Sequence, residues 1–114
     1  MSESKLRTQS MDFAVSIINL VKSLKEKREA IISNQIGRSG TSIGANIREA
    51  QYAHGKADFI AKLQIALKEC SESEYWIELL IESGYYNDKE LLNKCVEVKR
   101  ILIASINTAK ENGK

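Results

Sequence analysis

The sequence predicts an all-α protein folded as an antiparallel up-down-up-down four-helix bundle. The 114 residues contain no proline, the residue that most strongly interrupts helices. Helix-favouring residues dominate, and no segment alternates apolar and polar positions as a half-buried strand does. Apolar residues instead recur every three or four positions in four successive segments, the pattern of amphipathic helices. Helices joined by short connections pack side by side, so we expect one domain covering residues 1–114.

The predicted helices span about residues 9–24, 28–54, 57–83 and 88–111. The first begins near Thr8 to Ser10, and its apolar stripe keeps spacings of four and three residues: Phe13, Ile17, Leu20 and Leu24. The polar run at residues 22–29 comes next and is open to two interpretations, a basic contact surface or a solvated helix end with a short loop. Its acidic and basic residues interleave, which favours the second interpretation.

Three glycines, Gly37, Gly40 and Gly44, lie inside the second helix. Each costs about 1 kcal/mol relative to alanine, and their spacing of three and then four places them on one stripe. A phosphate-binding loop would need a preceding strand and a following Lys-Ser or Lys-Thr pair, which are absent. An apolar face runs through the glycines: Ile36, Ile43, Ile47 and Ala50. We therefore predict a smooth packing surface, directed at a helix of either the same subunit or a neighbouring one.

Turn and capping residues separate the remaining helices. Gly55 is expected to cap the end of the second helix, and Asp58 lies near the start of the third. The third helix would be about 40 Å long at 1.5 Å per residue, and Gly84 is expected to end it. The segment 87–90 then offers an N-cap with a glutamate three residues on. Two such long helices and the glycine stripe together suggest self-association.

The sequence contains no recognisable catalytic, cofactor-binding or metal site. Di-iron bundles need Glu-x-x-His pairs. The single histidine is His54, and the residue three positions before it is Gln51 rather than a glutamate. Cys70 and Cys95 occupy apolar helical positions without CxxC spacing, which favours buried free thiols over a disulfide or a metal site. The hydroxyls of Ser39, Thr41 and Ser42 are expected to bond back to the preceding helical turn rather than act as nucleophiles. An enzyme is therefore not predicted.

Four charged residues are candidates for ion pairs between the second and third helices: Arg38, Arg48, Glu72 and Glu74. The two helices should run antiparallel, so either arginine could reach a carboxylate, and such a pair would set the register. An acid–base couple is the alternative, but the two glutamates are two residues apart and point roughly 200° from each other. Tyr75 and Trp76 are expected to be anchors at the rim or at an interface. The alternative, stacking on nucleic-acid bases, would need a basic groove beside them.

The charge and hydropathy patterns agree with a protein that stays in the cytoplasm. The formal net charge is only +2, which permits an anionic partner without requiring one. The first residues lack the apolar core of a signal peptide, and no run approaches the ~20 apolar residues of a membrane span. We therefore expect no membrane partner.

Two segments carry a family resemblance. Residues 35–50 read QIGRSGTSIGANIREA, and residues 56–80 read KADFIAKLQIALKECSESEYWIELL. Both are similar to the signature of the bacterial four-helix-bundle family encoded in ribosomal RNA intervening sequences. The resemblance extends from about Phe13 to Ile106. Many members are chromosomal genes unconnected with ribosomal RNA, so the family name does not describe a function.

The resemblance implies an assembly and a class of partner. A relative in this family is the accessory variability determinant of diversity-generating retroelements, a barrel-like homopentamer that binds nucleic acid and its reverse transcriptase. A ring-like homo-oligomer, most simply a pentamer, and no enzymatic activity are therefore expected. The candidate nucleic-acid contacts are Lys22, Lys25, Lys27, Arg28, Arg38 and Arg48. The alternative is a protein-binding adaptor that recognises the product of a neighbouring gene without touching nucleic acid.

Overall fold

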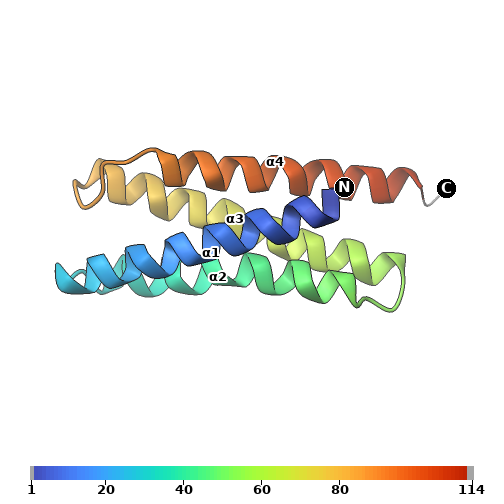
Figure 1. The fold of residues 1–114 in the computed structure, drawn as a ribbon, viewed down its shortest axis with the longest axis horizontal. Coiled ribbons are helices and arrows are strands. Elements are labelled where there is room, and N and C mark those ends of the chain that lie inside the picture. Colours follow the sequence, from blue (N-terminus) through green and yellow to red (C-terminus); the bar gives the residue numbers. More distant parts are fainter. Residues whose placement is uncertain (1, 113–114) are drawn as a thin grey trace.

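The protein is a bundle of four antiparallel helices. The computed structural model describes the backbone of residues 2–112 and the side chains of residues 5–112. The helices are α1 Ser2–Glu26, α2 Ile31–Gln51, α3 Lys56–Glu82 and α4 Glu90–Glu111. They form a rod of 50 × 21 × 19 Å, with the α1–α2 and α3–α4 connections at one end and the α2–α3 connection at the other (Figure 1). No strand occurs in residues 2–112, so the predicted all-α bundle is confirmed.

The helices occupy the corners of a square in chain order. Each packs against its neighbours in the sequence, and α4 closes the square against α1. Within the described chain, no Cα atoms of α1 and α3, or of α2 and α4, come within 8 Å of each other, so these helices are diagonal. The α1/α2 side of the bundle is therefore opposite the α3/α4 side. No helix of residues 2–112 is long and apolar enough to cross a membrane.

The core is aliphatic and is built from one buried stripe per helix. The predicted stripe of α1 is buried, since Phe13 and Ile17 are fully enclosed. The prediction that this helix starts near Thr8 to Ser10 is wrong, because α1 begins at Ser2. Leu6 and Ser10 continue the same spacing and are buried, so packing of Leu6 stabilises the earlier start.

The second helix is shorter at both ends than the predicted 28–54. Arg28 adopts a left-handed backbone conformation (φ 62°), which breaks the chain direction before α2. The carboxylate of Glu29 then accepts hydrogen bonds from the amides of Ile32 (3.1 Å) and Ser33 (2.8 Å). These amides have no carbonyl partner within the first turn of α2, so the Glu29 side chain caps the helix. No glycine or proline marks either feature in the sequence. The start of α2 was therefore predicted at residue 28 instead of at Ile31.

The other connections differ from the prediction at one glycine. Gly55 is not a C-terminal cap: its backbone is extended (φ 177°), and it precedes the first turn of α3. Asp58, in that first turn, accepts a hydrogen bond from the amide of His54 at 3.3 Å. Gly84 has φ 86° just beyond α3, as expected for a helix-ending glycine. Asp88 accepts from the amide of Glu90 at 2.9 Å and caps the start of α4.

Candidate functional site

The glycine stripe packs against α1 of the same chain. A Cβ added at Gly40 would lie 2.8 Å from Cγ1 of Ile17, whereas one at Gly37 would lie 3.5 Å from Cγ2 of Val21. At Gly44 the nearest neighbour is the hydroxyl of Ser10, at 3.6 Å. The stripe therefore faces α1 of the same chain, with the closest approach at Gly40, whereas Gly44 also lines an open groove between α1 and α2.

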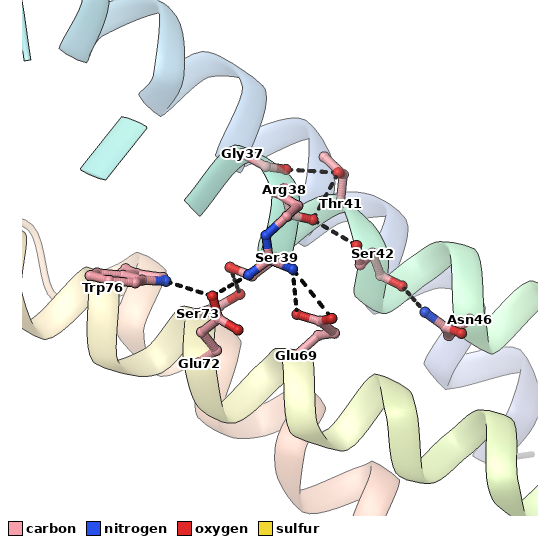
Figure 2. Close-up of polar contacts among 10 residues, drawn as sticks. All are labelled: Gly37, Arg38, Ser39, Thr41, Ser42, Asn46, Glu69, Glu72, Ser73 and Trp76. Carbon is pink, nitrogen blue, oxygen red and sulfur yellow. Dashed lines mark hydrogen bonds and ion pairs between the residues drawn. The ribbon is translucent and has the colours of Figure 1, made fainter. Parts of the chain in front are cut away.

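On the α3 side of α2, Arg38 bridges two carboxylates (Figure 2). Its guanidinium lies 3.1 Å from the carboxylate of Glu69 and also pairs with Glu72. The indole N–H of Trp76 donates to the same Glu72 carboxylate at 3.1 Å. The predicted contact between Arg38 and Glu72 is present. Glu69 was missed, although it lies three residues before Glu72 on the same face.

These contacts change the protonation equilibria of the cluster. The hydrogen bonds from Trp76 and then Arg38 hold the pKa of Glu72 below its ordinary value. The hydrogen bonds to Glu72 and Glu69 raise the pKa of Arg38 above the ordinary, already high value of a guanidinium group. Both ions therefore stay charged near neutral pH. Half of the Arg38 side chain is exposed, so this is a register-setting surface pair rather than a buried catalytic group.

The other two candidates for this ion pair do not join it. Glu74 lies on the opposite side of α3 and pairs with Lys99 of α4 at 2.5 Å, which raises the pKa of Lys99. Arg48 lies in the last turn of α2 and lines the side facing α1. The expectation that Arg48 or Glu74 pairs across α2 and α3 is therefore wrong. Because Glu72 faces α2 and Glu74 faces α4, the two carboxylates do not form an acid–base couple.

The small polar residues of α2 are engaged in structural hydrogen bonds. Thr41 and Ser42 donate to the carbonyls of Gly37 and Arg38, each at 2.7 Å, as predicted for hydroxyls inside a helix. The expectation is wrong for Ser39, whose fully buried hydroxyl accepts a hydrogen bond from Ser73 of α3 at 2.8 Å. The serines form a small polar layer within the aliphatic core.

The remaining groups with chemical potential lie apart. Cys70 and Cys95 are free, buried thiols on facing helices, with their sulfur atoms 3.7 Å apart. His54 lies in the α2–α3 connection. Within the described side chains, no group of three or more His, Cys, Asp or Glu residues is arranged to hold a metal ion.

The six basic candidates are all exposed but do not form one patch. Four of them gather at the end of the bundle where α1 joins α2: Lys22, Lys25, Lys27 and Arg28. Lys27 also donates to the carbonyl of Tyr85 at 3.0 Å and so ties this connection to the α3–α4 connection. Arg48 lies about 26 Å from the start of α2, given 1.5 Å per residue. The structure thus divides the candidates into one basic end and two separate arginines.

An exposed apolar stripe on α1 is a further feature of the surface. Met11, Val15 and Ile18 follow helical spacing and are 54%, 51% and 49% exposed. Beside them, α1 and α2 enclose an open groove of about 800 Å³. Its lining includes Arg7, Ser10, Met11, Ala14, Thr41, Gly44, Ala45 and Arg48. The sequence analysis missed this stripe, although the helical spacing of Met11, Val15 and Ile18 is visible in the sequence.

A second exposed apolar pair lies on the opposite side of the bundle. Val96 and Ile103 of α4 are 40% and 43% exposed. They flank Lys99 at three and four residues, and Lys99 reaches Glu74 of α3, so both lie on the side of α4 near α3. Tyr75, on the exposed face of α3, packs edge-on against Trp76 with ring centres 5.1 Å apart.

Comparison with known proteins identifies the family. Residues 2–104 match the model of the 23S rRNA-intervening sequence protein family. A crystal structure of a protein of unknown function from the S23 ribosomal protein family of Bacteroides thetaiotaomicron is 49% identical, with a TM-score of 0.90. The similarity covers 94% of this chain and 99% of that one. None of the curated proteins compared with the chain matches it. Since the family model spans nearly the whole chain, the protein belongs to the 23S rRNA-intervening sequence protein family.

Proposed function

We propose that this protein is a non-enzymatic, cytoplasmic helical scaffold. In this proposal it assembles into a ring-like homo-oligomer, with a pentamer favoured, and binds RNA, DNA or a nucleic-acid enzyme. The exposed apolar stripe of α1, beside the α1/α2 groove, is the observation that carries the proposal. Aliphatic side chains grouped on one helical face and half exposed are typical of a surface that another molecule covers.

A head-to-tail contact between copies accounts for both exposed apolar surfaces. The stripe of α1 lies on the α1/α2 side, and Val96 and Ile103 lie on the opposite α3/α4 side. Small residues such as Ala14 and Ala45 line the groove and leave room for the branched side chains of a neighbouring α4. A contact between two different faces forms a closed ring when the rotation between copies divides a full turn.

Assembly would also strengthen the charge available to an anionic partner. One chain carries a net charge of only +2, but its basic end comprises Lys22, Lys25, Lys27 and Arg28. Copies packed side by side in a ring place these ends on one rim. Grouped cations attract phosphates and release counterions on binding, which produces a salt-dependent affinity.

The oligomer is tested by light scattering on the purified protein. We expect a mass several times that of one chain, and we expect Val15→Glu to reduce it to a monomer. Val15 is half exposed, so this variant should keep its helical circular dichroism. Ile65→Glu is the matched control, because Ile65 is also an exposed aliphatic residue but lies on the α2/α3 side, one turn from Glu69. A monomeric wild-type protein would refute the assembly.

Nucleic-acid binding is tested separately by fluorescence anisotropy with RNA and DNA at several salt concentrations. We expect affinity at low salt that falls steeply as salt rises. A variant carrying Lys22→Glu and Lys25→Glu should bind more weakly, whereas Lys110→Glu, at the other end of the bundle, should bind as the wild type does. Absence of affinity at low salt would exclude the nucleic-acid part of the proposal.

The alternative function is a protein-binding adaptor without nucleic-acid contact. The mixed lining of the α1/α2 groove favours it, because apolar residues such as Met11 and Ile47 lie beside charged residues of both signs, Arg48 and Glu49. Such a groove suits an amphipathic protein helix. Pull-downs from cells would then recover a protein partner that survives nuclease treatment and is lost with Val15→Glu. A partner that disappears after nuclease treatment would favour the nucleic-acid scaffold instead.

A further inference from the structure

Cys70 of α3 and Cys95 of α4 form a pair in the centre of the bundle. Both side chains are fully buried, and their sulfur atoms lie 3.7 Å apart. The thiol of Cys70 lies 3.3 Å from the carbonyl oxygen of Cys95, and the thiol of Cys95 lies 3.4 Å from the carbonyl oxygen of Cys70. Each sulfur therefore touches both the side chain and the backbone of the other residue.

This geometry is close to that of a disulfide. A disulfide has a sulfur–sulfur distance of about 2.05 Å, so the two sulfur atoms need to approach by about 1.7 Å. Since each thiol already contacts the backbone of the opposite residue, the two helices are close enough at this level for side-chain rotation to supply most of that movement. The helices do not need to slide along one another.

We propose that the Cys70–Cys95 pair is an oxidative modification site, at which hydrogen peroxide or another small hydroperoxide produces a disulfide joining α3 to α4. In the first step the sulfur of one cysteine attacks a peroxide oxygen and the O–O bond breaks. The thiol proton goes to the departing oxygen, which leaves as water from hydrogen peroxide or as an alcohol from an organic hydroperoxide, and a sulfenic acid remains. In the second step the other sulfur attacks the sulfenic sulfur and the S–O bond breaks. The departing hydroxide takes the second thiol proton and leaves as water, and the disulfide remains.

Burial determines how this reaction proceeds. The hydrogen bond with Cys70 and the burial of the site raise the pKa of the Cys95 thiol, so this cysteine is protonated and reacts slowly in the closed bundle. A small hydroperoxide can enter during brief openings of α3 from α4. The second thiol is already in contact, so it captures the sulfenic acid before further oxidation. The product closes a loop across a separation of 25 residues, which restricts the unfolded chain.

The test uses the full-length protein, reduced and then treated with hydrogen peroxide. Free thiols are alkylated with N-ethylmaleimide in denaturant, and the products are analysed by intact mass and non-reducing peptide mapping. We expect a mass lower by two hydrogen atoms, no alkylation, and a peptide linking Cys70 to Cys95. Dithiothreitol should reverse all three changes. The disulfide should raise the Tm by roughly 10 °C.

Two variants and a second temperature keep the inference falsifiable. Cys70→Ser and Cys95→Ser should each retain a single thiol that is alkylated or gains oxygen, with no increase in Tm on treatment. The wild-type reaction is also repeated just below the Tm, where openings of the bundle are frequent. Two alkylated thiols at both temperatures, a gain of oxygen without a cross-link, or a disulfide between two chains would each overturn the proposal.

Discussion

Gly40 is the residue at which the backbone of α2 comes closest to α1. A Cβ at this position would lie 2.8 Å from Cγ1 of the β-branched Ile17 side chain, and both residues are buried. A Cβ added at Gly37 or at Gly44 would lie at an ordinary van der Waals distance from its nearest neighbour. The three glycines therefore share one stripe, but only Gly40 is required by the packing.

We expect the three Gly→Ala variants to separate in stability. At Gly37 and Gly44 the gain in helix propensity should raise the free energy of unfolding by about 0.5–1 kcal/mol. Gly40→Ala should lower it by about 1–2 kcal/mol, because Ile17 must move within a filled core. Urea unfolding measures all three. A Gly40→Ala variant as stable as the other two would contradict the close approach of the helices.

The buried serine pair gives a second residue-scale prediction. Within the described chain, the side chains of Ser39 and Ser73 form a hydrogen bond to each other and to no other group. Ser39→Ala should lower the free energy of unfolding by about 1–3 kcal/mol, because it leaves the Ser73 hydroxyl buried without a partner.

A double-mutant cycle tests this coupling. The variant with both serines replaced by alanine should be at least as stable as Ser39→Ala alone, because it buries no unpaired hydroxyl. Additive losses in urea unfolding would show instead that each serine acts independently.

At the scale of single elements, the start of α2 depends on a side chain outside the helix. Glu29 precedes α2 yet accepts hydrogen bonds from two of its first amides. We expect Glu29→Ala to lower the free energy of unfolding by about 1 kcal/mol through loss of the cap. Glu29→Gln should lose less, since the amide oxygen can still accept. The exposed Glu26 is the matched control, and an equal loss in Glu26→Ala would remove the capping explanation.

The pairing of α2 with α3 carries a pH dependence at Glu72. Its pKa is lowered in the folded protein, so its carboxylate stabilises the fold above the pKa of the unfolded chain. This contribution is lost as the pH falls through the lower folded pKa. We therefore expect the stability difference between the wild type and Glu72→Gln to be present at neutral pH and to shrink below about pH 4.

Thermal unfolding between acidic and neutral pH measures this difference. Glu78→Gln is the control, because Glu78 is exposed on the same helix and has no ion pair within the described chain. Salt should weaken the Glu72 effect, since the partner Arg38 is half exposed. A pH-independent difference for Glu72→Gln would show that the cluster contributes through packing alone.

At the scale of the whole molecule, the arrangement of helices places the two exposed apolar surfaces on opposite sides. If copies meet head to tail, Val15→Glu blocks one face and Ile103→Glu blocks the other. Each variant alone should be monomeric, whereas an equimolar mixture should form heterodimers and no larger species. Light scattering on the mixture measures this. Two variants that stay monomeric together would indicate a contact between like faces.

The helices and the core could be predicted from the sequence because their signals are local. The stripe from Phe13 to Leu24 follows helical spacing and is buried in the structure. Helix ends were predicted less well, since the left-handed Arg28 and the capping Glu29 carry no glycine or proline signal. Among the polar residues, Arg38 and Glu72 were correctly matched, but Glu74 pairs with α4 instead.

The sequence by itself determined the all-α class, the aliphatic core and the family, because all three depend on residue type and spacing along one chain. Only the tertiary structure decided that Gly40 meets Ile17 of α1, that Ser39 bonds to Ser73, and that apolar surfaces lie on opposite sides. These facts depend on which helices become neighbours and on their relative rotation. Residues far apart in the chain set that arrangement through packing, and no local pattern records it.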